Sequence, residues 1–343
     1  MTDKKVLLLT GSGFTKNFGG FLASDMSEML YTDPNIIGLP DVRQMMKDNF
    51  NFENVYTLVM NDDAYDPTVK KKVRSAIASA YKTQEEKIDE TKTQYSPNTI
   101  SAIPTFLKRH VEFFFTLNQD LFVEDRFTHN LSGRSLTMPA SPTNLNGFDK
   151  KKDVPLHPKE EFEKRRAEEE KRLSKPNKIC YFKLHGSSNW LGSERRELAV
   201  IVGSDKPKKF PEPLLEWYKS IFINSIGRKN QTLLIIGYGF NDEWVNEELC
   251  NAIDNHSLSG VIIDVVDRDT FREKMTKEKE KANKPPHLTK VTDKAKHERE
   301  KKNDNLRVKI YNAFSYFPIN SLGELFSSKV DLGRLKNELG LPH

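Results

Sequence analysis

The sequence is poor in cysteine and has no long apolar run. Its 343 residues include two cysteines, Cys180 and Cys250, which excludes a disulfide framework and a zinc ribbon built from Cys-x-x-Cys pairs. No stretch approaches the roughly 20 apolar residues that span a bilayer. The apolar run near the N-terminus is also too short for a signal peptide. We therefore expect a cytoplasmic protein without a membrane segment.

Charge is plentiful but nearly balanced. Lys and Arg number 54 against 49 Asp and Glu, which gives a net charge of +5, and the mean hydropathy is −0.65. Most of the lysine excess lies in charge-mixed runs, which are typical of solvated helix faces. No compact patch of basic and aromatic residues indicates a nucleic-acid site. Direct nucleic-acid binding is therefore open but not favoured, and the length permits a sizeable core.

An apolar strand followed by alternating polar residues marks the candidate site. Val111 to Phe115 is apolar apart from Glu112, which predicts a buried strand. Thr116, Asn118 and Asp120 follow at alternate positions, so an extended chain would place them on one face. In open parallel sheets ligands bind at the carboxyl ends of the strands. This polar face is therefore a candidate binding site.

Further apolar segments predict a parallel α/β sheet. Each is followed by a polar or glycine-containing loop, and amphipathic helices are expected at 213–226 and 243–254, the latter capped by Asn241 or Asp242. The expected strands are 5–10, 179–184, 231–236, 261–266 and 306–311, with a short one at 198–203.

Three other segments interrupt this pattern within one domain that spans 1–343. Residues 21–107 show apolar residues at helical spacing and predict a helical module inserted between two strands. Residues 132–176 and 272–304 are dense in charge and predict surface insertions, with an exposed helix at 159–173. These insertions are either solvated surfaces or contact sites for a partner.

Two glycine turns suggest a nucleotide site. Gly11, Ser12, Gly13, Phe14 and Thr15 follow the first strand, where glycines let the backbone approach a phosphate; an ordinary strand-to-helix turn is the alternative.

A second turn contains Gly237 and Gly239 and opens a βαβ unit whose second strand leads to Asp267. Dinucleotide folds place a ribose-binding carboxylate near this position. The two turns together suggest a dinucleotide.

His185 follows the strand at 179–184, in the sequence His-Gly-Ser. A lone histidine is usually structural, but Asn118 and Asp120 leave a neighbouring strand end, so the three side chains would meet. Imidazole can act as a general base toward a ribose hydroxyl, and an asparagine can orient a ribose or a water. Cleavage of NAD at the nicotinamide bond needs such a site and no metal.

These motifs resemble the sirtuin superfamily, and most closely its bacterial branch of sirtuin-like NAD-hydrolysing domains in anti-phage defence systems. The resemblance rests on four motifs in the expected order, at 11–15, 116–120, 183–187 and 237–242. It implies a Rossmann-like NAD-binding fold.

By position, the resemblance assigns four roles. Phosphates would be contacted by Gly11, Ser12, Gly13 and Thr15. The adenosine side would be held by Gly237, Gly239 and Asp267, and the nicotinamide ribose would lie at Asn118 and Asp120. His185 would be the catalytic base. Deacylating sirtuins carry four zinc cysteines after their His-Gly motif, whereas this chain has only Cys250 there, so no zinc module or other metal is expected and deacylation is disfavoured.

We therefore expect an NAD hydrolase that produces nicotinamide and ADP-ribose and depletes cellular NAD in abortive infection. The resemblance implies a homo-oligomer and suggests a hexameric DNA-translocase ATPase as a partner. Two alternatives remain: a sensor that binds NAD or ADP-ribose without turnover, and an ADP-ribosyltransferase.

Overall fold

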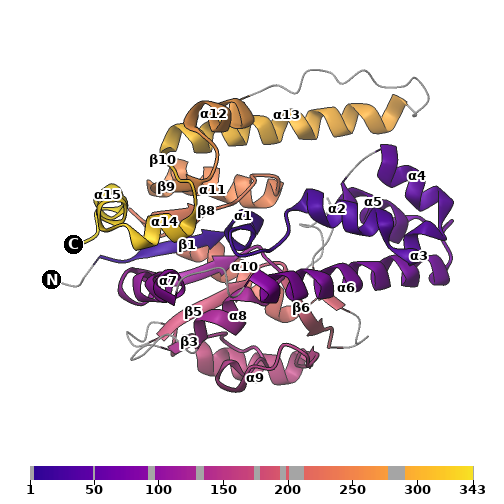
Figure 1. Cartoon of the computed structure of the whole chain (residues 1–343), viewed down its shortest axis with the longest axis horizontal. Helices are drawn as coiled ribbons and strands as arrows, with labels where there is room; N and C mark the ends of the chain where they lie inside the picture. Colours follow the sequence, from indigo (N-terminus) through magenta and orange to yellow (C-terminus); the bar gives the residue numbers. More distant parts are fainter. Residues whose placement is uncertain are drawn as a thin grey trace.

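A seven-stranded sheet lies at the centre of the protein (Figure 1). This computed structural model describes residues 4–48, 51–91, 97–128, 135–173, 178–193, 198–200, 212–276 and 290–342. The strand order is β10-β9-β8-β1-β2-β5-β3, and neighbouring strands are parallel throughout. The strands are β1 (Val6–Thr10), β2 (Val111–Thr116), β3 (Ser135–Thr137), β5 (Lys178–Lys183), β8 (Thr232–Ile236), β9 (Ser259–Asp264) and β10 (Phe314–Pro318). The predicted Rossmann-like α/β fold is confirmed.

The central strands are mostly apolar because helices cover both faces of the sheet. Every residue of β1 and β8 is buried. Thr10 pairs with Thr116 on one side and with Ile236 on the other, and Thr116 pairs with Lys183. The strands β8, β1, β2 and β5 therefore end level with one another, and the loops that follow them start from one edge.

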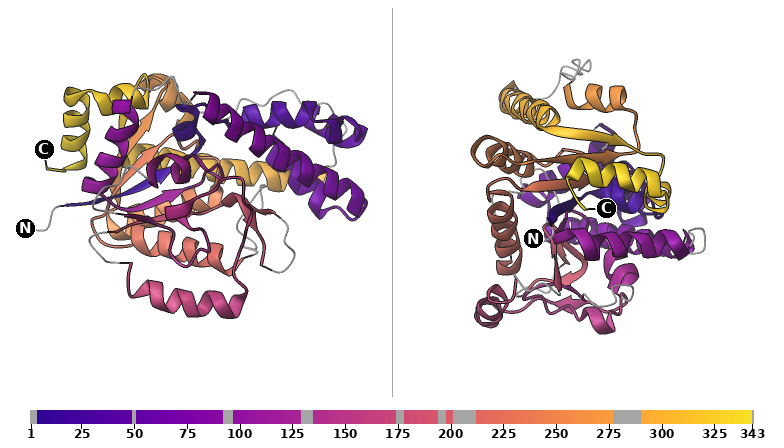
Figure 2. Two further views of the ribbon diagram at one scale, coloured as in Figure 1. Left: turned by 60° about the horizontal axis from the view of Figure 1, so that its bottom comes forward. Right: turned by 90° about the vertical axis from the view of Figure 1, so that its left-hand side faces the viewer.

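Two layers of helices enclose the sheet (Figure 2). On one face lie α7 (Pro97–His110), α14 (Leu322–Ser327) and α15 (Lys329–Leu339), and on the other α10 (Pro213–Ile226) and α11 (Glu243–His256). The predicted helix at 213–226 is confirmed, and the helix expected at 243–254 extends to His256. Within the described ranges, no helix combines the length and apolarity needed to cross a membrane.

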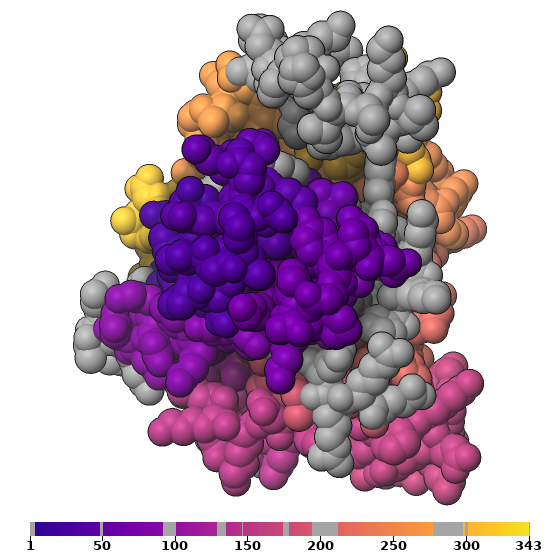
Figure 3. All heavy atoms as spheres, turned by 90° about the vertical axis from the view of Figure 1, so that its right-hand side faces the viewer, coloured from indigo at the N-terminus to yellow at the C-terminus, as the bar shows by residue number. Residues whose placement is uncertain are grey.

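A helical arm with its own core extends from one side of the sheet. It contains α2 (Ala23–Thr32), α3 (Pro34–Ile37), α4 (Pro40–Asp48), α5 (Phe52–Asn61) and α6 (Pro67–Glu90). Thirteen buried residues between Met26 and Tyr81 form a hydrophobic cluster separate from the sheet core. Figure 3 views this arm end on, between the α12–α13 segment and the segment that includes α9. The long helix α6 joins the two cores, since its Ile88 belongs to the core around the sheet.

A second, three-stranded sheet and several surface helices come from the segments between the main strands. The small sheet has the order β4-β6-β7, from β4 (Val154–Pro155), β6 (Gly186–Leu191) and β7 (Leu198–Val200). The charged helix expected near 159–173 is present as α9 (Lys159–Glu170), and most of its residues are exposed. Parts of the predicted insertions, at 132–134, 174–176 and 277–289, lie outside the described residues, as do 201–203 of the short strand. The remaining helices are α1 (Ser12–Lys16), α8 (Phe122–Phe127), α12 (Arg268–Thr276) and α13 (Lys290–Ala313).

The strand predicted at 306–311 is wrong, because these residues belong to α13. Their sequence alternates apolar and polar residues, which mimics a strand. In the structure Ile310 is fully buried and Leu306, one helical turn earlier, packs against the same core. The last strand of the sheet is instead β10, where aromatic Phe314 and Phe317 are buried.

Candidate functional site

Main-chain hydrogen bonds join the four loops at the carboxyl edge of the sheet. The Leu117 N–H donates to the Thr10 carbonyl at 2.9 Å, and the Leu184 N–H donates to the Thr116 carbonyl at 2.9 Å. The Ser188 N–H donates to the Gln119 carbonyl at 2.7 Å. The loops that sequence reasoning assigned to one site are therefore neighbours in the structure.

The two glycine turns pack directly against each other. The Gly13 N–H donates to the Gly237 carbonyl at 2.9 Å, and the Gly11 N–H donates to the Ile236 carbonyl at 3.0 Å. Gly237 has φ of +61°, and a Cβ there would lie 2.3 Å from the Phe14 nitrogen. Glycine is thus needed at Gly237 for both conformation and space. Both of these amide groups stabilise the joint between the turns, whereas the sequence predicted that they would contact phosphates.

Residues of the first turn have divided roles. Phe14 is 1 % exposed, and its ring packs edge-on against those of Phe18 and Phe114, so its side chain belongs to the core. Thr15 is also buried, but it faces the loop after β2, where Asn118 Nδ2 donates to Thr15 Oγ1 at 3.3 Å. Ser12, at the first position of α1, is half-buried.

Strand β2 ends at Thr116, so the alternation that suggested one polar face does not continue as extended strand. Thr116 Oγ1 accepts from Thr10 Oγ1 at 2.8 Å and from the Asn118 N–H at 3.0 Å. This hydroxyl closes the turn between the strand and residues 117–121, which we call the site loop. Asn118 and Asp120 lie beyond it, each less than 10 % exposed. These contacts give Thr116 a structural role at the end of the strand.

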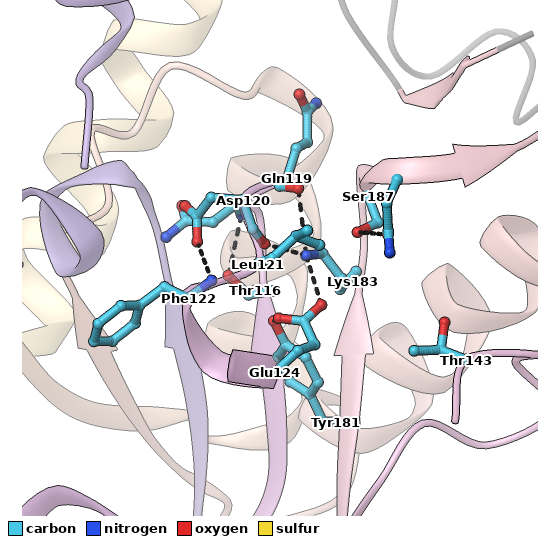
Figure 4. Close-up of polar contacts among 12 residues, drawn as sticks. Thr116, Gln119, Asp120, Leu121, Phe122, Glu124, Thr143, Tyr181, Lys183 and Ser187 are labelled. Carbon is cyan, nitrogen blue, oxygen red and sulfur yellow. Dashed lines mark hydrogen bonds and ion pairs between the residues drawn. The ribbon is translucent and has the colours of Figure 1, made fainter. Parts of the chain in front are cut away.

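A buried ion pair between Lys183 and Glu124 lies next to the site loop (Figure 4). Lys183 Nζ lies 2.8 Å from Glu124 Oε1, and both side chains are almost completely buried. The same ammonium group donates to the main-chain carbonyls of Gln119 and Asp120. Lys183 therefore joins the end of β5 to both the site loop and α8.

Sequence reasoning missed this pair, although a lysine at the end of the apolar segment 179–184 was a signal that a buried partner exists. Glu124 is 59 positions earlier in the chain, and no local pattern connects the two. Burial raises the pKa of the Glu124 carboxyl, and the Lys183 charge acts against this shift.

The helical arm also reaches the site loop. Glu85 of α6 accepts from the Leu121 N–H at 2.7 Å. Burial, followed by the nearby charge of Asp120, raises the pKa of Glu85 to about 8. Burial also raises the pKa of Asp120, against the stabilising charge of Lys183. Glu85 was not foreseen, because it comes from a helix that the sequence placed outside the site.

His185 lies at the start of the small sheet, between β5 and β6. Its side chain is 3 % exposed, and Nε2 lies 3.7 Å from Oδ1 of Asp242. The imidazole also packs near the Trp244 ring, with 6.2 Å between ring centroids. Gly186 follows with φ of +82°, a conformation that favours glycine.

Helix α13 fixes the turn after β8. Arg307 donates to the Phe240 carbonyl at 2.8 Å and to Asn241 Oδ1 at 2.7 Å. The Tyr238 hydroxyl donates within the same region, to the Asp242 carbonyl at 3.2 Å. Gly239 is less constrained than Gly237, because the nearest atom to a Cβ at Gly239 would be Nδ2 of the Asn241 side chain, at 3.2 Å.

Asp267 has the contacts of a helix cap. Strand β9 ends at Asp264, and Asp267 follows at the start of α12. Its carboxylate accepts from the Thr270 N–H at 2.9 Å and from the Thr270 hydroxyl at 2.5 Å. These bonds lower the pKa of Asp267. The structure thus brings together Asn118, Asp120, Thr15 and the glycine turns, with His185 next to the turn after β8, while Asp267 is exposed and caps a helix.

No group of three or more His, Cys, Asp or Glu residues suited to a metal ion occurs in the described part of the chain. Cys180 and Cys250 are separate, buried thiols.

Comparison with known protein families identifies the family of this chain. The family model described as SIR2-like domain matches residues 112–308, which is more than half of the chain. No curated protein matches.

Proposed function

Because the chain belongs to the SIR2-like domain family, we propose that it is an NAD hydrolase that cleaves NAD to nicotinamide and ADP-ribose with water as the acceptor. The family points to a function that involves NAD in general. The observation that supports NAD hydrolysis in particular is the position of Asn118 and His185. They follow the adjacent strands β2 and β5 at the carboxyl edge of the sheet, and both are buried.

The chemistry fits these side chains. Loss of nicotinamide leaves positive charge on the ribose, so a cleaving site must position the ribose and control access of water. Asn118 presents an amide whose orientation is fixed by Thr15, and this amide is suited to orient a ribose hydroxyl or the attacking water. His185 would accept the proton of that hydroxyl or water. The buried carboxylate of Asp120 would favour the developing positive charge.

Hydrolysis is a better proposal than deacylation. After His185 the sequence has only Cys250, so it lacks the four zinc cysteines of the deacylating enzymes. The acceptor would then be water rather than an acyl group.

In the cell, we propose that this reaction depletes NAD as the effector of an anti-phage defence system. A homo-oligomer and a hexameric DNA-translocase ATPase are the partners that the sequence resemblance suggests. The exposed charged residues of α9 would be available for such contacts.

Incubation of the purified protein with NAD, followed by chromatography, tests the proposal. Nicotinamide and ADP-ribose should form with the wild type, and Asn118→Ala and His185→Ala should each abolish their release. The exposed asparagine Asn255, changed to alanine, is the matched control and should keep full activity. NAD levels in infected cells that express each variant provide the parallel measurement with the trigger present.

Other outcomes would contradict hydrolysis. Tight NAD binding without product, both in the tube and in infected cells, would identify a sensor. Transfer of labelled ADP-ribose to protein or DNA would identify an ADP-ribosyltransferase.

A further inference from the structure

Asp242 occupies a capping position but does not act as a cap. It is the N-cap residue of α11, yet its carboxylate accepts no capping hydrogen bond from the helix. Other helices of the described chain begin with Asp, Asn or Ser residues that do accept such bonds. These are Asp33, Asn51, Asp66, Ser321 and Ser328. A capping bond stabilises the start of a helix, so its absence at Asp242 suggests a different role for the carboxylate.

The carboxylate faces His185 instead. The distance from Asp242 Oδ1 to His185 Nε2 is 3.7 Å, which is longer than a hydrogen bond but within the range of an ion pair. Both side chains are largely buried, at 12 % and 3 % exposure, so solvent screens their interaction weakly. The Trp244 ring, on the first turn of the same helix, packs near the imidazole.

We propose that Asp242 is a positioning residue for His185, and that it holds the imidazole proton on Nε2 so that Nδ1 is the nitrogen that accepts a proton. This inference rests on the proposed function. In the reaction, the O–H bond of the attacking water breaks as the Nδ1–H bond forms. The water oxygen bonds to the ribose carbon, and nicotinamide leaves with the electron pair of the glycosidic bond. Asp242 then stabilises the imidazolium.

Other charged groups around this pair have partners of their own. On one side Lys183 pairs with Glu124, beside Asp120 and Glu85. On α11 Glu243 pairs with Lys302 of α13, and Arg307 of α13 contacts Asn241 and Asp304. Lys219 of α10 lies over the Trp244 ring. Among the described residues, Asp242 is thus the carboxylate placed at ion-pair distance from His185.

The Asp242→Asn variant separates this role from capping, since asparagine is an equally good N-cap residue of nearly the same shape. We expect thermal stability close to that of the wild type, a turnover number at least tenfold lower and a similar KM. The acid limb of the kcat/KM profile should move to lower pH by about one unit, because a carboxylate at this distance favours the charged imidazole. Asp66→Asn, at an exposed N-cap of α6, is the matched control and should leave the profile unchanged.

Histidine NMR gives a readout that does not require turnover. Spectra of protein with ¹⁵N-labelled histidine, with His185→Gln to assign the signal, should show the Nε2-protonated tautomer in the wild type. In Asp242→Asn the titration midpoint of His185 should fall by about one pH unit.

The outcomes separate the two proposals. If His185 shows the expected tautomer and shift but NAD is not cleaved, the hydrolase proposal fails and the pairing of Asp242 with His185 stands. If NAD is cleaved but wild-type His185 carries its proton on Nδ1, the positioning role of Asp242 is overturned. The positioning role is also overturned if Asp242→Asn keeps the wild-type pH profile of kcat/KM and the wild-type titration midpoint of His185. If the variant does not fold, the tautomer of His185 in the wild-type spectrum alone tests the positioning role.

Discussion

Replacing Lys183 with methionine removes the charge from a side chain that is wholly buried and paired with Glu124 at 2.8 Å. Methionine has a similar length, so the main loss is electrostatic rather than a loss of packing. Breaking a buried ion pair by removing one partner costs about 3–5 kcal/mol. The carbonyls of Gln119 and Asp120 lose their donor at the same time.

The part of this cost that comes from the unpaired Glu124 has an upper bound at neutral pH, because the carboxylate can take up a proton, and the lost donor to the two carbonyls adds to it. Each pKa unit corresponds to about 1.4 kcal/mol, so holding a glutamate carboxyl, whose ordinary pKa is 4.5, in its neutral form at pH 7 costs about 3 kcal/mol. We therefore expect Lys183→Met to lower the free energy of unfolding by about 3–5 kcal/mol at pH 7. At pH 5 protonation of Glu124 costs less than about 1 kcal/mol by the same conversion. The destabilisation by Lys183→Met should therefore be roughly 2–3 kcal/mol smaller at pH 5 than at pH 7. A protein of ordinary stability would still fold.

Guanidinium denaturation at both pH values, followed by tryptophan fluorescence and circular dichroism, measures this difference. The double variant Lys183→Met, Glu124→Gln contains no unpaired charge and should recover most of the lost stability at pH 7. A single variant within about 1 kcal/mol of wild type at pH 7 would refute the reasoning, since the expected penalty is several times larger. A double variant no more stable than the single one would also refute it.

Four further variants test other parts of the site. Burial and the Asp120 charge raise the pKa of Glu85 to about 8, so the stability this group contributes is present below pH 4.5 and is lost as pH rises through 8. Glu85→Gln should therefore narrow the difference in Tm between pH 5.5 and pH 9 in thermal melts. Gly237→Ala should destabilise the protein by several kcal/mol, because φ is +61° and the new Cβ would overlap backbone atoms at 2.3 Å. A Cβ at Gly239 has more space, so Gly239→Ala should leave the free energy of unfolding close to that of the wild type. A weaker NAD affinity of this variant in calorimetry would then identify a role of Gly239 in NAD binding. Asp267→Ala should cost about 1 kcal/mol of unfolding free energy as a lost cap but leave NAD cleavage at the wild-type rate.

The sheet was predictable because its inner strands are buried on both faces and are therefore continuous apolar runs. β1, β2, β5 and β8 were each placed to within one residue at either end. The segment 306–311 failed because alternation over six residues fits a strand, whereas the real determinant was burial of Ile310 and Leu306 on one face of a helix. Local patterns cannot separate these cases when tertiary contacts decide.

The site was predictable only in part. The sequence identified the loops, because glycines, polar residues and strand ends have local signals. It did not identify the residues that hold those loops, such as Glu85, Glu124 and Arg307, because each reaches the site from a helix remote in sequence. Phe14 and Asp267 lie in motifs that predicted cofactor contacts, whereas in the structure the Phe14 ring packs in the core and the Asp267 carboxylate caps a helix.

The central place of β1 has a consequence for synthesis of the protein. β1 is the first strand of the sheet in the chain, yet it lies in the middle, between β2 and β8, and β8 ends more than 200 residues later. At a translation rate of about 5–20 residues per second, β1 waits roughly 10–40 s for its second neighbour. During that time an apolar strand has an unpaired edge, which favours aggregation and recruits chaperones. A truncated chain that stops before β8 should therefore accumulate as insoluble protein, however complete its first half is.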